Sequence, residues 1–186
     1  MKLSKTAELL RKEKLLVATS GEFDFSSITC DSRKVKKNAL FFVKGAAFRE
    51  EFLFSALQKG AGGYIAEKDF GIDCPRIRVT DIRLAMPLIA KEFYQNPAAR
   101  FMLTGVTGTK GKTTVTYMLR NIFAEHFGED FVGMISTNEA SNGKKQIEKT
   151  GTTPEALPLY EIFDDFAKSG VKAAVMEVSS QALQYN

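Results

Sequence analysis

The stretch FMLTGVTGTKGKTT, residues 101–114, decides the fold of this 186-residue chain. Its first six residues form an apolar run that predicts a buried strand, and the amphipathic pattern from about Lys112 to His126 predicts a helix. The glycines between them let the backbone turn tightly, so that successive N–H groups converge on one point. A strand, a glycine-rich turn and a helix N-terminus in this order predict a binding site for phosphate groups.

Two side chains of this loop carry the chemistry that phosphate groups require. The Lys112 ammonium would reach the β- and γ-phosphates of a nucleotide, and the Thr113 hydroxyl would bind Mg²⁺. The usual spacing places the first glycine where Val106 stands, whereas Gly105 and Gly108 lie on either side of it, so this loop is a variant. The alternative is a glycine-rich turn that arose by chance and binds nothing.

A second candidate site residue is Glu177, near the end of the apolar run Lys172–Val178. The run predicts a buried strand, and ligands of open α/β sheets bind beyond the carboxyl ends of the strands. The carboxylate would then lie on the same sheet edge as the glycine-rich loop and serve as a second oxygen ligand of Mg²⁺ beside Thr113. The alternative is a glutamate at a strand end that pairs with a lysine.

Three polar motifs are weaker signals. Residues 152–155, Thr-Thr-Pro-Glu, predict a helix start with a threonine cap and a proline in the first turn, and such a start can also bind an anionic substrate. Asp31-Ser32-Arg33 follows one predicted strand and Lys44-Gly45 follows the next. Each of these two is, on its own, typical of an ordinary polar turn.

The composition excludes several classes of protein. With 44% apolar and 26% charged residues the chain is typical of a globular protein, and no apolar run approaches the ~18 residues that cross a bilayer. The net charge of +4 is small and spread out, so we expect neither nucleic acid nor a membrane as a partner. The single histidine excludes a histidine-rich metal site, and the two cysteines are expected to stay reduced in the cytoplasm.

Short apolar runs alternate with helical patterns, which predicts an α/β protein. The turn-rich segment 95–99 is the expected boundary between a domain of residues 1–98 and a second of residues 99–186. Expected helices cover residues 6–12, 50–59, 82–94, 112–126 and 154–168, the third of them capped by Asp81, and expected strands cover 27–30, 39–43, 63–66, 76–79, 101–106, 131–136 and 172–178. On the helix after the glycine-rich loop, the side chains expected to face the core are Val115, Met118, Leu119, Ile122 and Phe123.

Taken together these motifs resemble the Mur ligase family over essentially the whole chain. The matching segments are TCDSRKV at 29–35, ALFFVKG at 39–45, GVTGTKGKTT at 105–114, IST at 135–137 with TTPE at 152–155, and MEVSS at 176–180. The pairing of IST with TTPE is typical of the member that adds the third residue of the peptide. The resemblance implies an N-terminal mixed α/β domain that binds UDP-MurNAc, followed by the start of a P-loop domain that binds ATP.

The resemblance also implies a role for each matching residue. ATP would be held by Gly108, Thr109, Lys110, Gly111, Lys112, Thr113 and Thr114; Mg²⁺ by Thr113 and Glu177; the UDP-sugar by Ser32; and the muramoyl-dipeptide by Thr152, Thr153 and Ser179. Lys112 and Glu177 would be the catalytic residues. The implied reaction activates the D-glutamate carboxylate of UDP-MurNAc-L-Ala-D-Glu as an acyl phosphate, which an amino-acid acceptor, L-lysine or meso-diaminopimelate, then attacks. The implied protein is a cytoplasmic monomer.

Some positions depart from the family pattern. Many relatives carry Asn at Lys110 and His at Gln181, and the segment after Gly45, residues 46–51, replaces their Asp-Gly-His. The family also needs a lysine and a C-terminal domain beyond Glu177, and residues 101–186 hold about three strands at ~30 residues per βα unit. We therefore expect the chain to be inactive alone, with apolar faces uncovered.

Two other functions remain open at this point. One is a folylpolyglutamate-type ligase, which the Asp31-Ser32-Arg33 motif disfavours because that motif suits a UDP-sugar. The other is a non-catalytic fragment that binds a nucleotide or a UDP-sugar.

Overall fold

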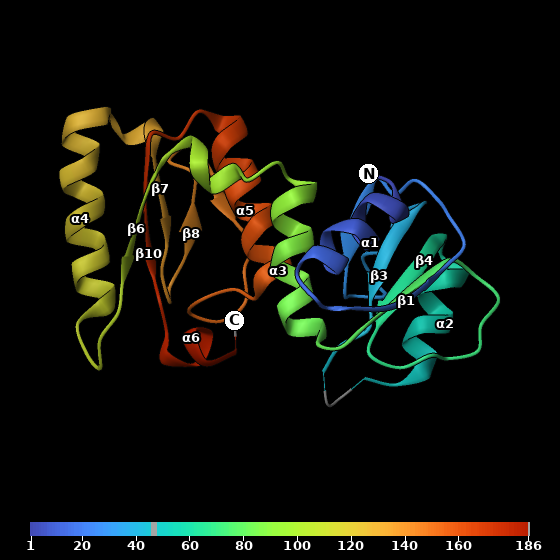
Figure 1. The fold of residues 1–186 in the computed structure, drawn as a ribbon. Helices are drawn as coiled ribbons and strands as arrows, with labels where there is room; N and C mark the ends of the chain where they lie inside the picture. The colour runs from blue at the N-terminus through green and yellow to red at the C-terminus, as the bar shows by residue number, and fades with distance from the viewer. Residues whose placement is uncertain (46–47, 186) are drawn as a thin grey trace. The chain divides into compact units, whose positions relative to one another are not determined.

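The computed structural model describes residues 1–45 and 48–185, so Ala46 and Ala47, the first residues of the segment that departs from the family, lie outside the described part. The chain forms two compact units, Met1–Phe93 and a second from Tyr94 onward (Figure 1). Each unit is a mixed α/β structure with one mixed sheet, which confirms the predicted fold class. Among the described residues no helix is both long and apolar enough to cross a membrane.

The first unit is built on a sheet with the strand order β1-β5-β4-β3-β2. Its elements are α1 (Leu3–Lys12), β1 (Leu16–Ser20), β2 (Ser27–Thr29), β3 (Ala39–Phe42), α2 (Glu50–Gln58), β4 (Ala61–Ala66), β5 (Arg76–Val79) and α3 (Ile82–Phe93). Strands β2 to β5 are parallel, and β1 pairs antiparallel with β5 at one edge. The carboxyl ends of β2 and β3 therefore lie side by side, and so do the two polar turns that follow them.

Most elements of this unit agree with the sequence patterns. Strand β5 has the predicted bounds, and α3 begins after Asp81, whose Oδ1 accepts bonds from the backbone N–H groups of Arg83 and Leu84 at 2.7 and 3.1 Å. Strand β1 was not predicted, because an edge strand with four exposed residues shows no apolar pattern. On α2, Leu53 is buried as its spacing indicates, but Phe52 is 42% exposed.

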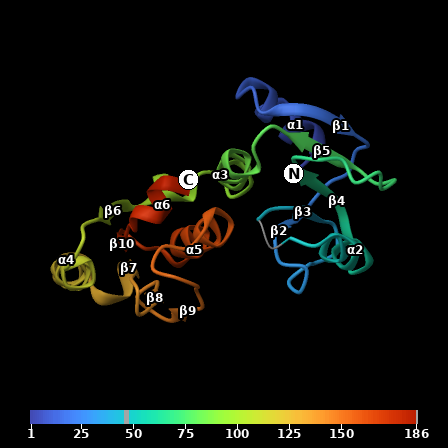
Figure 2. The same cartoon turned by 90° about the horizontal axis from the view of Figure 1, so that it is seen from below.

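The second unit has a sheet with the strand order β6-β10-β7-β8-β9. Its elements are η1 (Pro97–Arg100), β6 (Met102–Val106), α4 (Lys112–Phe127), η2 (Glu129–Phe131), β7 (Val132–Ile135), β8 (Ala140–Ser141), β9 (Gln146–Ile147), α5 (Ala156–Ser169), β10 (Ala173–Glu177) and α6 (Ser180–Tyr185). Strands β6, β10 and β7 are parallel, and β8 and β9 form an antiparallel hairpin beside β7. Helices α4 and α5 lie on opposite sides of β7 and β10 (Figures 1 and 2).

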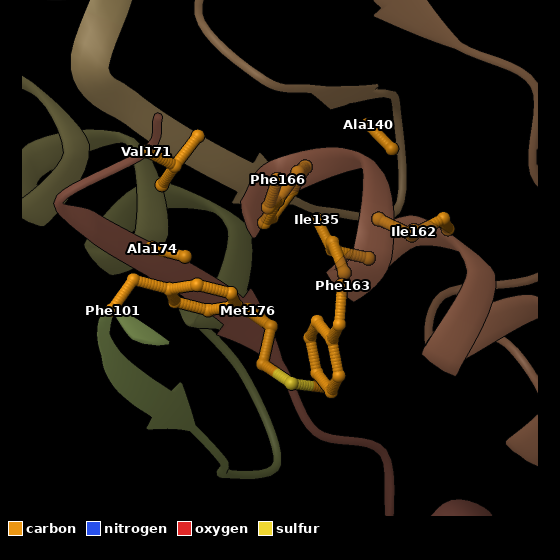
Figure 3. Close-up of a cluster of buried hydrophobic side chains, with 9 residues drawn as sticks. All are labelled: Phe101, Ile135, Ala140, Ile162, Phe163, Phe166, Val171, Ala174 and Met176. Carbon is orange, nitrogen blue, oxygen red and sulfur yellow. The ribbon is translucent and has the colours of Figure 1, made fainter. Parts of the chain in front are cut away.

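The core of the second unit lies between the sheet and α5. Figure 3 shows its side chains, which are Phe101, Ile135, Ala140, Ile162, Phe163, Phe166, Val171, Ala174 and Met176. A Cβ atom on Gly133 would lie 2.6 Å from the Phe166 ring, so only glycine fits beneath it. Because side chains alternate along a strand, Ala174 and Met176 face α5, whereas Val175 and Glu177 face the side of α4.

On the face of the sheet that carries α4, several side chains that were predicted to be buried are exposed. Strand β6 forms as expected but lies at the sheet edge, with Met102 and Leu103 exposed. On α4, the side chains of Val115, Met118 and Ile122 are 43%, 58% and 62% exposed, so the prediction that they face the core was wrong. An apolar stripe shows that a helix has an apolar side, but the pattern alone does not show what covers it.

Candidate functional site

The glycine-rich loop joins β6 to α4 as the sequence predicts. Strand β6 ends at Val106 and α4 begins at Lys112, with Gly111 at the N-cap in the left-handed conformation (φ +78°) that favours glycine. No side chain of the described residues caps α4, so the first N–H groups of the helix point into the loop without a side-chain partner. The Lys112 Nζ donates to the Gly108 carbonyl at 2.8 Å. The loop therefore gathers N–H donors and an ammonium, which suits an anion.

Glu177 lies directly beside the start of this loop. It is the last residue of β10, its register partner on β6 is Val106, and the next N–H, of Val178, donates to the Val106 carbonyl at 2.8 Å. The Glu177 side chain is 1% exposed. The structure thus brings together the two strongest features of the sequence, at the carboxyl edge of neighbouring parallel strands.

The partner of the buried carboxylate is Thr137, two residues after the end of β7. Its backbone N–H donates to Glu177 Oε1 at 2.8 Å, and its hydroxyl lies 3.1 Å from Oε2. Thr137 belongs to the IST segment, but no role of its own was predicted for it. Thr137 follows β7, the strand next to β10, and this position would have indicated its role. That β7 and β10 are neighbours is known only from the strand order.

The threonines of the TTPE segment meet the same strand end. The Thr153 hydroxyl donates to the Glu177 carbonyl at 2.9 Å and accepts a bond from the Ser179 N–H at 2.9 Å. The hydroxyl oxygens of Thr152 and Thr137 lie 3.2 Å apart. Thr152 and Thr153 of the TTPE segment and Glu177 and Ser179 of the MEVSS segment are therefore gathered in one place.

The predicted threonine cap of the following helix is wrong. Helix α5 begins at Ala156 with Glu155 at the N-cap, and no side-chain bond to the helix is made there. The Thr153 hydroxyl is already engaged by Glu177 and Ser179, so it is not used as a cap. The residues that were expected to start a helix instead tie the chain to the end of β10.

Lys149 completes the cluster. Its Nζ donates to the carbonyl oxygens of Thr137 at 3.0 Å and Gly151 at 2.6 Å. Burial lowers the pKa of Lys149, and the negative charge of Glu177 acts in the opposite direction. A cavity of about 410 Å³ opens here between the β8–β9 hairpin and the residues Thr137, Lys149 and Thr152.

The fit of Mg²⁺ to this edge follows from the oxygen atoms present. Within the described residues no group of three or more His, Cys, Asp or Glu side chains could hold a metal ion. Mg²⁺ commonly takes only one or two protein oxygens and completes its shell with phosphate and water. A buried carboxylate at Glu177 and a hydroxyl at Thr113 beside a phosphate loop match that requirement.

The first unit carries a separate candidate site in the turn after β2. The Arg33 guanidinium binds both carboxylate oxygens of Asp31, at 2.9 and 2.8 Å, and lowers the pKa of that carboxyl from 3.8 to about 2. Lys59 Nζ donates to the Ser32 carbonyl at 3.0 Å. The turn therefore has a fixed shape, held by charged groups on both sides.

A cavity of about 540 Å³ lies next to this turn. Its walls are Cys30, Asp31, Ser32, Arg33, Phe41, Lys44, Gly45, Phe48 and Phe52. The two motifs that are weak on their own, residues 31–33 and 44–45, thus line one cavity with three aromatic rings. Such a cavity offers a flat apolar surface together with basic groups.

Comparisons with known proteins agree with this arrangement. Residues 106–186 match the Mur ligase middle domain family. The chain is 45% identical over 159 residues to a UDP-N-acetylmuramoyl-L-alanyl-D-glutamate–L-lysine ligase of Streptococcus pneumoniae, covering 85% of this chain and 32% of the relative. A Streptococcus mutans ligase of the same name is 44% identical over 162 residues, covering 87% and 33%. The chain thus spans about a third of the length of the curated relatives it matches.

Two solved structures share the fold. A UDP-N-acetylmuramoyl-L-alanyl-D-glutamate–2,6-diaminopimelate ligase superposes with a TM-score of 0.71 at 26% identity, over 87% of this chain and 33% of that one. A MurF ligase from Thermotoga maritima in complex with ADP gives 0.55 at 25% identity, over 83% and 32%. The family match over residues 106–186, the sequence identity and the fold agree in showing that this chain is similar to Mur ligases.

Proposed function

We propose that this protein is an ATP-dependent amide ligase of peptidoglycan precursor synthesis, which adds an amino acid to UDP-MurNAc-L-Ala-D-Glu in the cytoplasm. The observation that carries the proposal is the buried Glu177 carboxylate beside the glycine-rich loop, within a chain 45% identical to a ligase of that name. A phosphate loop with an acidic partner suits phosphoryl transfer, which depends on positioning and charge neutralisation more than on a protein nucleophile.

The nucleotide would bind along the loop between β6 and α4. We assign its phosphates to Gly108, Thr109, Lys110, Gly111, Lys112, Thr113 and Thr114, whose backbone N–H groups and side chains surround the start of α4. Lys112 would leave the Gly108 carbonyl and contact the β- and γ-phosphates. Thr113 and Glu177 would hold Mg²⁺, which when bound neutralises the charge of the phosphates.

The parts of the second substrate are assigned to residues of each unit taken by itself. We assign the UDP-sugar to residues 1–98, with Ser32 and the aromatic walls of the neighbouring cavity in contact with it. We assign the muramoyl-dipeptide to Thr152, Thr153 and Ser179 in residues 99–186, because these groups surround Glu177. The D-glutamate carboxylate would thereby reach the γ-phosphate held by the loop.

The reaction proceeds in two displacement steps. An oxygen of the D-glutamate carboxylate attacks the γ-phosphorus of ATP, the bond to the β,γ-bridging oxygen breaks, and ADP leaves. The amine of the acceptor then attacks the acyl carbon, loses a proton and expels inorganic phosphate, which leaves an amide. In the first step Lys112 would stabilise charge on the transferred group, and Glu177 would help to hold the divalent cation, which supplies further charge neutralisation when bound.

We propose L-lysine as the acceptor, because the ligases that are 40–45% identical to this chain are named for L-lysine. The solved diaminopimelate ligase is 26% identical. Acceptor choice is therefore one arm of the test.

The test is release of ADP and phosphate by the protein expressed from its complete gene. We expect turnover to require Mg²⁺, UDP-MurNAc-L-Ala-D-Glu and L-lysine together, with little turnover when meso-diaminopimelate replaces lysine. Turnover with a folate and glutamate instead would identify a folylpolyglutamate-type ligase. Nucleotide binding without turnover on any of these substrates would identify a binding module and contradict the proposal.

A further inference from the structure

Thr137 and Lys149 lie around Glu177 but have no role in the site as assigned so far. The geometry points to a positioning role for both: Thr137 orients the Glu177 carboxylate, and Lys149 holds Thr137 in place. The inference rests on the proposed function, since it concerns how Glu177 is presented to the divalent cation.

The direction of the hydroxyl bonds supports the role of Thr137. A hydroxyl group has one proton to donate, and an ionised carboxylate can only accept. The Thr137 hydroxyl, 3.1 Å from Glu177 Oε2, therefore donates to it, and the Thr152 hydroxyl, 3.2 Å away, donates to Thr137. An ordered chain runs from Thr152 through Thr137 to Glu177.

The same contacts leave the carboxylate able to bind a cation. Each oxygen of Glu177 receives one bond from Thr137, one from the N–H at 2.8 Å and one from the hydroxyl. A carboxylate has about four lone-pair sites, so each oxygen keeps one. Thr137 fixes the plane of the carboxylate and leaves one lone pair on each oxygen for a cation. Residues that orient metal ligands act in this way.

Lys149 holds Thr137 from the other side. Thr137 itself is exposed, and the Lys149 ammonium joins its carbonyl to that of Gly151, next to Thr152. Lys149 follows a hairpin that is anchored to α5 by the buried Asn142, whose Nδ2 donates to Asp165 at 2.6 Å and to Ser169 at 2.9 Å. The ammonium contacts carbonyl oxygens, so its positive charge lies near Glu177 while the carboxylate oxygens are held by Thr137.

The experiment compares ADP binding with and without Mg²⁺ by calorimetry, on the protein expressed from its complete gene. The variants are Thr137→Val, which removes only the hydroxyl, Thr137→Ser, which restores it, and Lys149→Met. Lys145→Met is the matched control, because Lys145 belongs to the same hairpin segment and pairs with Asp165 at the surface. Thermal unfolding of each variant is recorded in parallel.

We expect Thr137→Val to reduce the Mg²⁺-dependent gain in ADP affinity about tenfold and to leave Mg²⁺-free binding unchanged. Thr137→Ser and Lys145→Met should keep the full gain, and Lys149→Met should lose part of it. A full gain in both Thr137→Val and Lys149→Met would overturn the inference, and so would equal losses in Thr137→Val and Thr137→Ser. Wild-type protein that binds ADP with no Mg²⁺-dependent gain would refute the positioning role alone, whereas wild-type protein without any ADP binding would refute the proposed function.

Discussion

Two acidic residues of this chain lie at or just after the carboxyl ends of parallel strands and are held in different ways. Asp31 follows β2 in the first unit, and its partner Arg33 lies two residues further along the same turn, with its side chain 85% exposed. Glu177 ends β10 in the second unit, is 1% exposed, and is held by Thr137, forty residues away in sequence. A local pair can be expected from the sequence, whereas a buried group held by distant partners depends on the strand order.

The difference has an energetic consequence. An exposed ion pair contributes little, because water screens it and two side chains lose freedom. A buried carboxylate has lost its hydration and depends on its hydrogen-bond donors. We therefore expect substitutions around Glu177 to have larger effects than substitutions around Asp31.

The largest effect is expected for Lys112→Ala. Removal of the ammonium should weaken ATP binding on the order of 100-fold, since a hydrogen bond to a charged group is worth ~1.5–3 kcal/mol. Calorimetric titration with ATP checks this, with Lys168→Ala, which removes an exposed lysine of α5 that pairs with Asp164, as the control for loss of one positive charge. ATP affinity that is unchanged in Lys112→Ala would count against the loop as the nucleotide site.

Glu177→Gln comes next and tests the buried half of the comparison. The amide NH₂ would face one of the two Thr137 donors, so we expect a loss of about 1–3 kcal/mol in the free energy of unfolding. Urea denaturation measures it, and Glu148→Gln, an exposed glutamate of the hairpin region, should change stability little. Equal stabilities of the two variants would show that the Glu177 contacts contribute nothing.

Ser32→Ala is expected to have a smaller effect on binding. Loss of one neutral hydrogen bond, ~0.5–1.5 kcal/mol, should weaken UDP-MurNAc binding roughly 3- to 10-fold. Fluorescence or calorimetric titration with UDP-MurNAc measures it, with the exposed Ser26→Ala as control. If both variants bind equally well, the cavity beside Ser32 is not the sugar-nucleotide site.

The smallest effect is expected for Asp31→Asn, and it depends on pH. The pKa of Asp31 is lowered to about 2, so the folded protein binds this proton less readily than the unfolded chain. The stabilisation is complete above about pH 4 and is lost as the pH falls through about 2. Because Arg33 is exposed, we expect less than about 1 kcal/mol at neutral pH.

Urea denaturation at several pH values checks this prediction. The wild type should lose slightly more stability than Asp31→Asn on acidification from about pH 5 to about pH 2. Parallel pH curves for the two proteins would show that the Asp31–Arg33 pair does not stabilise the fold.

Much of the fold could be predicted because its signals are local. The order of strand, loop and helix around residues 101–114, the cap at Asp81 and the bounds of β5 depend on neighbours in sequence. The exposed side of α4 and the edge strand β1 could not be predicted. The periodicity of a segment does not show whether other elements cover it.

The sequence predicted several residues of the candidate site, but it did not predict the hydrogen bonds that join them. Glu177, Thr152, Thr153 and Ser179 were each expected from a motif, and the structure brings them together. No role was predicted for Thr137 and Lys149, and Thr153 was expected to cap a helix. The contacts that these three residues make around the end of β10 can be known only once the strand order is known. A hydroxyl that forms hydrogen bonds with residues distant in sequence is no longer available to cap the adjacent helix.

The most direct test of the proposed chemistry follows the carboxylate oxygens of the substrate. UDP-MurNAc-L-Ala-D-Glu, with ¹⁸O in both oxygens of the reacting carboxylate, is converted by the protein expressed from its complete gene with ATP, Mg²⁺ and L-lysine. Mass spectrometry of the released phosphate should find one ¹⁸O atom in it, with the other retained in the new amide. Phosphate without label, at equal yield of the amide, would contradict transfer through an acyl phosphate.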